Sequence, residues 1–163
     1  MPAKGFERLD LPEAGAKCEV PAGWEKTGGG EEDRRERIFG VVLAAPRAAP
    51  GPGASVSIEY YAPDNAYFSS AAQFLDHQAS APGAGKPAPA KVRGRKAQRW
   101  QRSSTEVFPP NTVTGRRVEM RTETVLLEAA TGFYVLSVKA PAPEFVQRRK
   151  AFQRVLDTFD PRR

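Results

Sequence analysis

Histidine is the side chain that most often serves as a general base near neutral pH, and this sequence contains a single one, His77. Asp76 precedes it, and a neighbouring aspartate could orient the imidazole ring for proton transfer. No motif places a serine or cysteine nucleophile beside this pair. We therefore expect His77 to be a solvated helix residue, and an enzyme that uses Asp76 and His77 is the weakest of three functional hypotheses.

Metal and thiol chemistry find little support in the residue pattern. A metal site needs several nitrogen, sulfur or carboxylate ligands close together, and the only cysteine, Cys18, lies far from His77 in the sequence. The acidic run 31–33 lacks the alternating spacing of a calcium loop and is typical of a solvated segment. Lys17 could lower the pKa of the Cys18 thiol, but a half-buried strand cysteine explains the residue as well. The sequence predicts a protein that is not an enzyme, with no catalytic residue, metal site or cofactor.

The strongest chemical signal is a basic stretch from Lys86 to Arg102 that contains no acidic residue. Basic strands with an aromatic side chain can bind phosphate backbones and stack bases. The candidate binding surface consists of Arg93, Arg95, Lys96, Arg99 and Trp100. Strand alternation would expose the arginines on one face, while Trp100 could pack inward from the other. Charge that solvates a face or protects a sheet edge explains the same pattern, so both interpretations stay open.

Strands and helices that would position these residues follow from hydrophobic periodicity. Strands are predicted over residues 16–20, 37–43, 55–61, 91–107, 117–127 and 133–138. The glycine Gly132 is expected to turn the chain between the last two strands. Helices are predicted after an N-cap at Ser69 or Ser70 and, with a clear amphipathic stripe, over residues 144–159.

The remaining segments are predicted to be irregular. Residues 1–15 read as a flexible N-terminal arm, residues 27–37 as a solvated loop, and residues 79–90 as a long flexible connection. Consecutive strands joined by loops favour antiparallel pairing. The sequence therefore predicts one α+β domain in which two helices cover the faces of a central antiparallel sheet of about six strands.

The overall composition fits one globular domain with a charged surface. The chain has 163 residues and a formal net charge of +6, which permits contact with nucleic acid, anionic lipid or an acidic protein. No apolar run is long enough to predict a transmembrane segment, and no signal peptide is recognised at the start. Two interpretations of location remain: a cytoplasmic protein as written, or an exported protein whose signal preceded Met1.

Several segments together resemble a known family. They are Val20–Trp24, Ser55–Tyr61, Val92–Ala97, Gly132–Leu136, Ala140–Pro141 and Phe152–Phe159. Their order and residue types are similar to those of small bacterial lipoproteins of the Mog1/PsbP-like group, which are related to DcrB-type proteins and are largely of unknown function. The resemblance covers roughly residues 16–160. It implies a single domain over these residues, an α/β/α sandwich around an antiparallel sheet, and an accessory or scaffold role. It carries over no catalytic residue. Cys18 does not follow a lipobox, since Lys17 stands where a small residue is needed.

Two functional hypotheses lead from these observations. The first is a non-catalytic binding or assembly module of a bacterial cell envelope, periplasmic or anchored through a lipid on a removed N-terminal segment, with a protein or lipid-linked partner. The second is a nucleic-acid or polyanion binder that uses the basic strand 91–102. The sequence does not predict the oligomeric state.

Overall fold

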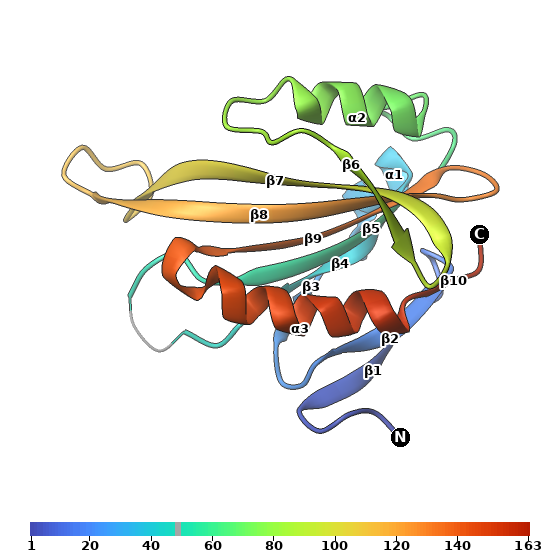
Figure 1. The fold of residues 1–163 in the computed structure, drawn as a ribbon, viewed down its shortest axis with the longest axis horizontal. Helices are drawn as coiled ribbons and strands as arrows, with labels where there is room; N and C mark the ends of the chain where they lie inside the picture. The colour runs from blue at the N-terminus through green and yellow to red at the C-terminus, as the bar shows by residue number, and fades with distance from the viewer. Residues whose placement is uncertain (48–49) are drawn as a thin grey trace.

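The computed structural model describes residues 1–47 and 50–163. Two antiparallel sheets form the frame (Figure 1). The smaller has the strand order β1-β2-β10 and the larger the order β3-β4-β5-β9-β8-β7-β6. The strands are β1 (Phe6–Leu11), β2 (Ala16–Pro21), β3 (Glu25–Thr27), β4 (Ile38–Ala44), β5 (Ser55–Tyr61), β6 (Ala88–Val92), β7 (Arg95–Phe108), β8 (Arg116–Glu128), β9 (Phe133–Pro141) and β10 (Asp160–Pro161). The helices are α1 (Glu31–Glu36), α2 (Ala71–Ala79) and α3 (Phe145–Thr158), with a 3-10 turn, η1 (Ala142–Glu144), before α3.

Helices cover both faces of the larger sheet, which confirms the predicted sandwich (Figure 1). On β8, Val125 and Leu127 belong to the core under α3, whereas Leu126 belongs to the smaller core under α2. Both faces of this strand are therefore shielded from water, and burial on both sides explains its continuous apolar run. The sheet has seven strands among the described residues, against about six predicted.

The unit formed by β8, β9 and α3 follows the sequence prediction closely. The turn between the strands contains Gly132 at a φ of +71°, a conformation that favours glycine. Helix α3 then lies against β9 and β2, and its buried side chains are Phe145, Phe152, Val155 and Leu156. Its apolar stripe is therefore core packing, as expected from the helical spacing.

The predicted N-terminal arm is wrong for residues 6–11, which form β1. This strand pairs with β2 in register from Phe6↔Pro21 to Leu11↔Ala16. Leu9 and Leu11 pack against the main core, and Asp10, the charged residue between them, is exposed. The side chain of Tyr134 ties the following turn to the sheet, because its hydroxyl donates a hydrogen bond to the Ala14 carbonyl at 2.8 Å.

The predicted loop over residues 27–37 contains the short helix α1. None of its residues is buried, so it has no apolar stripe that periodicity could detect. Its charges suit the helix dipole instead, since Glu31–Asp33 lie in the first turn and Arg34 and Arg35 in the last.

The predicted strand 91–107 is a hairpin of β6 and β7. Arg93 and Gly94 form its turn with φ angles of 48° and 82°, and Val92 pairs with Arg95. Part of the predicted flexible connection 79–90 is thus strand β6, which also carries Pro89. Proline is tolerated there because β6 lies at the edge of the sheet.

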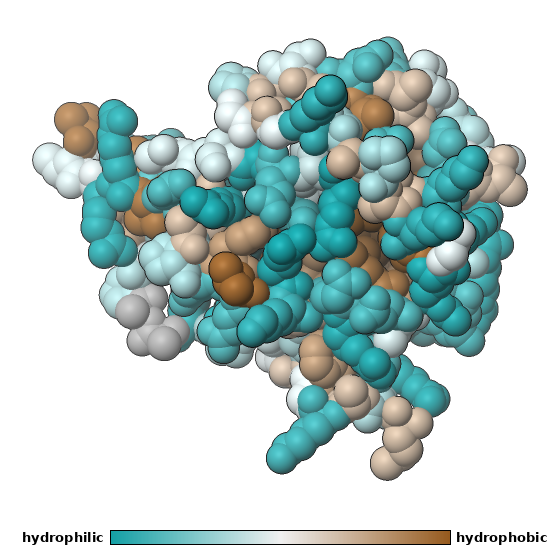
Figure 2. Space-filling view, viewed as in Figure 1, coloured by the Kyte–Doolittle hydropathy of each residue, from teal (hydrophilic) through white to brown (hydrophobic). Residues whose placement is uncertain are grey.

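Strands β7 and β8 continue beyond their neighbours as a two-stranded projection, called here the outer hairpin (residues 104–119). β8 pairs with β9 only from Met120 onward, whereas its pairing with β7 runs out to Phe108↔Arg116. Figures 1 and 2 show this projection on the left of the molecule. Exposed Val107 and Val113 lie at its end.

Among the described residues, no helix combines the length and apolarity that a membrane crossing requires.

Candidate functional site

The predicted basic surface is divided among three environments in the structure. Arg95 and Lys96 are exposed at the start of β7. Arg93 lies in the turn, where its Nη1 donates to the Phe159 carbonyl at 3.4 Å and lies 4.0 Å from the Asp160 carboxylate. Arg99 faces the α3 side of the sheet and is engaged in an ion pair. The arginines therefore do not form one continuous face.

Trp100 is buried rather than presented for stacking. Only 4% of it is exposed, and its ring lies 6.5 Å from that of Phe74 on α2. The prediction that Trp100 forms part of a binding surface is wrong, and inward packing, the alternative from the strand pattern, is correct. Because α2 covers this face, a nucleic-acid base cannot stack on the indole ring without displacing the helix.

A buried carboxylate, Glu123, connects the sheet to α3. Its side chain is 2% exposed and accepts hydrogen bonds from Arg99 Nε and Nη2, both at 2.8 Å, and from Arg149 Nε at 3.0 Å. Burial alone would raise the pKa of Glu123, but the hydrogen bonds from Arg99 and Arg149 outweigh it and hold the pKa below its ordinary value. This carboxylate is ionised at neutral pH and is occupied in holding α3 on the sheet.

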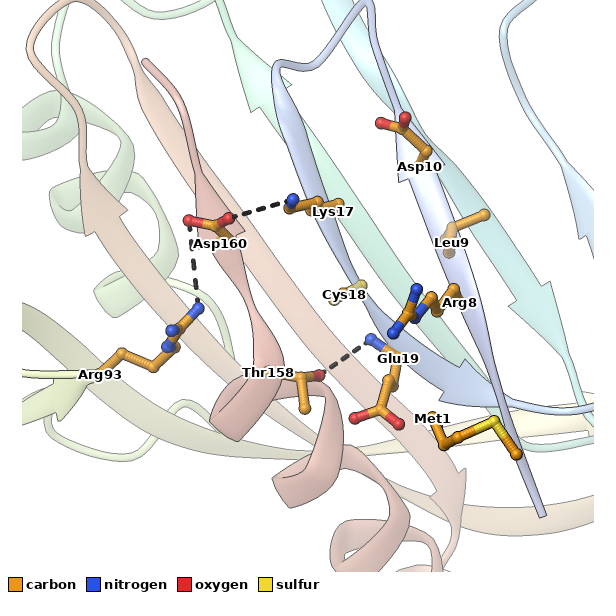
Figure 3. A pocket seen from close by; sticks show the side chains of 10 residues that line it. All are labelled: Met1, Arg8, Leu9, Asp10, Lys17, Cys18, Glu19, Arg93, Thr158 and Asp160. Atoms are coloured by element: carbon orange, nitrogen blue, oxygen red, sulfur yellow. Dashed lines mark hydrogen bonds and ion pairs between the residues drawn. The ribbon is translucent and has the colours of Figure 1, made fainter. Parts of the chain in front are cut away.

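A groove of about 490 Å³ lies where β1, β2 and β10 meet the end of α3 (Figure 3). Its charges compensate one another, because Asp160 lies 3.8 Å from Lys17 and 4.0 Å from Arg93. The Glu19 backbone N–H donates to Thr158 Oγ1 at 2.9 Å, as Figure 3 also shows. The polar groups of this groove thus connect β2 to the C-terminal segment.

Cys18 lies at the bottom of this groove on β2, 6% exposed. Burial, with a smaller contribution from the charge of Glu19, raises the pKa of its thiol to about 12. The thiol is therefore protonated at neutral pH and is a poor nucleophile. Lys17, the residue that could have lowered this pKa, is instead paired with Asp160.

His77 and Asp76 lie on the exposed side of α2. The imidazole ring packs edge-on against Phe68, with ring centroids 5.5 Å apart. Neither side chain is brought near Cys18, Glu123 or the groove in Figure 3. Within residues 1–47 and 50–163, no group of three or more histidine, cysteine or acidic side chains is arranged to hold a metal ion.

A second hollow, of about 580 Å³, lies at the base of the outer hairpin and is called here the arginine cavity. It is lined by residues 46–47 and 50–54 between β4 and β5, by the first residues of β8, by the end of β9 and by the start of α3. Its charged lining consists of Arg47, Arg116, Arg117, Arg148, Glu119 and Glu144. Four guanidinium groups against two carboxylates make it a net positive site.

Sequence reasoning did not identify the arginine cavity. Arg47 lies in a proline-rich loop, Arg116 and Arg117 at the start of a strand, and Arg148 on the polar side of a helix. Each looks like an ordinary surface charge in its own segment. Only the antiparallel pairing of β8 with β9, followed directly by α3, brings these segments together.

Comparison with known proteins shows the fold. No protein-family model and no curated protein sequence matches the chain. Among solved structures, cyanobacterial PsbP from Synechocystis sp. PCC 6803 matches with a TM-score of 0.55 and 10% identity over 96% of this chain and 92% of that chain. The Ran-binding protein Mog1p of Saccharomyces cerevisiae matches with 0.53 and 10%, over 95% and 94%. LpqN, involved in cell envelope biogenesis of Mycobacterium tuberculosis, matches with 0.51 and 17%, over 96% and 85%. The chain has the Mog1/PsbP-like fold that its sequence resembles.

Proposed function

We propose that this chain is a non-catalytic binding or assembly module of a bacterial cell envelope, which holds a protein or lipid-linked partner at the end of the sheet where the outer hairpin and the arginine cavity lie. The observation that carries the proposal is the contrast between two sets of charges. The buried carboxylate of Glu123 and the charges around Cys18 are matched by internal partners. The four arginines that line the open arginine cavity have no ion-pair partner among the described residues.

The chemistry of the other ionisable groups supports a role without catalysis. A general base needs a reacting group within hydrogen-bond reach, and His77 packs its ring on Phe68 at an exposed helix surface. The Cys18 thiol is held protonated by burial. An accessory role also agrees with the resemblance to proteins of the same fold, one of which is a Ran-binding protein.

The proposed location is the periplasm or the outer face of a membrane, with a lipid anchor on a segment that precedes residue 1. LpqN, which shares the fold, is involved in cell envelope biogenesis, and this supports the proposal. The alternative is a cytoplasmic protein. Expression of the tagged protein from its own gene, followed by fractionation and protease treatment of spheroplasts, separates the two. Recovery in a protease-protected cytosolic fraction would remove the envelope from the proposal.

Site-specific photo-crosslinking tests the binding surface itself. A photoreactive residue at Val113, which is fully exposed on the outer hairpin, should capture a discrete partner in the envelope fraction. The matched control is the same residue at Tyr67, which is 57% exposed in the segment before α2. Equal labelling from both positions would contradict a partner at the outer hairpin. A hydrolytic or transfer activity that His77→Ala abolishes would contradict a non-catalytic role.

A further inference from the structure

We propose that the arginine cavity binds the phosphate monoester group of an organic molecule. This inference rests on the proposed function, since it names the ligand chemistry of the same end of the molecule. It is argued from the charges of the cavity, from the side chain of Arg148 and from the shape and composition of the walls.

The arginines of the cavity are not neutralised by ion pairs within the described parts of the chain. No ion pair joins Arg47, Arg116, Arg117 or Arg148 to a carboxylate anywhere in the described parts of the chain. Glu119, one of the two acidic residues in the lining, lies 3.9 Å from Arg121. This ion pair is longer than those that Glu123 makes with Arg99 and Arg149. Four positive and two negative side chains leave a net charge of +2. Guanidinium groups that share one hollow repel one another unless an anion lies between them.

Arg148 is held in place at the wall by packing. Its guanidinium carbon lies 5.5 Å from the centre of the Trp24 ring, and its Nε is buried without a hydrogen-bond partner among the described residues. Because a water-sized group does not reach this nitrogen, the terminal nitrogens of the guanidinium, Nη1 and Nη2, are the donors left for a ligand. Arg148 also lies in the first turn of α3, a helix of 14 residues, where the backbone dipole favours an anion.

The remaining walls are largely apolar. Prolines contribute from both sides, namely Pro46, Pro50, Pro52, Pro141 and Pro143. Because proline restricts its backbone φ angle, these five positions have less backbone freedom than other residues would have. A hollow of about 580 Å³ is also of the size that small organic ligands occupy. The walls therefore offer room for an organic group beside the phosphate.

A phosphate monoester suits this lining better than a carboxylate or a phosphodiester. It carries a charge of about −1.5 to −2 at neutral pH, which balances the net charge of the cavity. Its oxygens accept paired hydrogen bonds from arginine, whose planar group presents two parallel donors. The source of the group can be a soluble metabolite or the head group of a lipid, and the chemistry recognised is the same.

The test is calorimetric titration of the whole chain with inorganic phosphate and glycerol 3-phosphate at low salt. Saturable binding is expected, tighter for glycerol 3-phosphate. The double variant Arg116→Gln/Arg117→Gln should weaken it about tenfold or more, because two of the four positive charges of the lining are lost. The control Arg35→Gln/Arg95→Gln removes the same charge at exposed positions outside the cavity and should stay within about twofold of the wild type. Binding should also weaken below pH 6, where the phosphate takes up a proton.

Absence of saturable binding to the wild-type chain overturns the proposal, and so does binding that the double variant retains. Arg116 and Arg117 are exposed, so the double variant is expected to fold, and a thermal unfolding curve checks this. If it unfolds, Arg117→Gln alone replaces it, with Arg95→Gln as its control. Loss of binding in both double variants overturns the proposal as well, since it shows attraction to overall charge.

Sedimentation with vesicles distinguishes the two sources. Binding to phosphatidic acid vesicles that glycerol 3-phosphate displaces, with none to phosphatidylcholine vesicles, identifies a lipid head group. Binding of the soluble ester alone identifies a metabolite. Vesicle binding that glycerol 3-phosphate does not displace would show that the vesicles bind outside the arginine cavity. If crosslinking at Val113 captures a partner but the chain binds no phosphate, the proposed function stands and the phosphate site is ruled out.

Discussion

Arg99 on β7 reaches diagonally to Glu123 on β8, and two of its nitrogens donate to the two carboxylate oxygens at 2.8 Å. The carboxylate side chain is 2% exposed and the arginine side chain 25% exposed, so the pair is largely shielded from water. Arg149 of α3 donates to the same carboxylate. A residue expected to bind an external anion therefore binds an internal one and helps to fasten a helix to the sheet.

Replacement of Arg99 should destabilise the fold. Arg99→Gln removes the paired contact and leaves Glu123 buried with Arg149 as its main partner. We expect a loss of about 2–3 kcal/mol in the free energy of unfolding, measured by urea denaturation. Arg95→Gln, an exposed arginine of the same strand, should change it by less than about 0.5 kcal/mol. Equal effects of the two substitutions would contradict the structural role of the pair.

Glu123 should also make the stability of the fold depend on pH in the acidic range. Although burial opposes ionisation, the hydrogen bonds from Arg99 and Arg149 hold its folded-state pKa below the ordinary value of 4.5. Its contribution is therefore complete above pH 4.5 and is lost as the pH falls through the lower folded-state pKa. The Glu123→Gln variant should be less stable than the wild type at pH 7, and the difference should shrink in thermal unfolding curves recorded toward pH 3. A constant difference would show that ionisation of Glu123 does not contribute.

Glu59 on β5 should have the opposite effect. Burial, with a smaller contribution from the charge of Asp33, raises the pKa of this carboxyl above 4.5. The folded state therefore disfavours ionisation, and the cost appears as the pH rises from the unfolded-state value through the folded-state pKa. Glu59→Gln should raise the melting temperature at pH 7 and leave it nearly unchanged at pH 4. An equal gain at both pH values would assign the effect to packing.

Cys18 should resist thiol reagents in the folded state. Because burial raises its pKa to about 12, reaction with a disulfide reagent at pH 8 should be slower by roughly a thousandfold than for an ordinary cysteine. The same protein in guanidinium chloride should react at the ordinary rate, which serves as the control. Rapid labelling without denaturant would show that the groove in Figure 3 opens to the thiol.

Gly132 should tolerate no side chain. At a φ of +71°, a Cβ atom would lie 2.2 Å from the Tyr61 carbonyl oxygen, which belongs to the neighbouring strand β5. Gly132→Ala should cost more than about 2 kcal/mol in unfolding free energy, since backbone strain of about 1–2 kcal/mol adds to the steric clash. Gly5→Ala is the matched control, with a φ of +81° and open space around it, and should show the strain alone.

The sequence predicts the parts of the fold that are determined by residues close to one another in the chain. On β5, Val56, Ile58 and Tyr60 alternate with half-exposed residues, and their burial follows the pattern. The N-cap expected at Ser69 or Ser70 is Ser70, whose hydroxyl accepts a hydrogen bond from the Gln73 backbone at 3.1 Å. In each case, the residues that decide the structure lie within a few positions of one another.

The parts that the sequence does not predict depend on distant partners. Strand β1 has only a few apolar residues, and its Leu9 packs against the core because β2 lies beside it. The basic stretch contains the tight turn at Arg93 and Gly94, which reverses the chain and separates side chains that a single strand would align. The residues that line the arginine cavity come from four segments of the chain, and no short sequence pattern indicates that these segments lie together.

The pairing of β10 with β2 has a consequence for biosynthesis. Asp160 lies opposite Lys17, so the small sheet joins the two ends of the domain, and nearly the whole domain must be translated before it can close. A nascent or truncated chain keeps one edge of β2 open, with backbone groups available to other strands. Proteases and chaperones would therefore meet an incomplete chain at this edge, which β10 covers at Ala16 and Lys17 once it is in place.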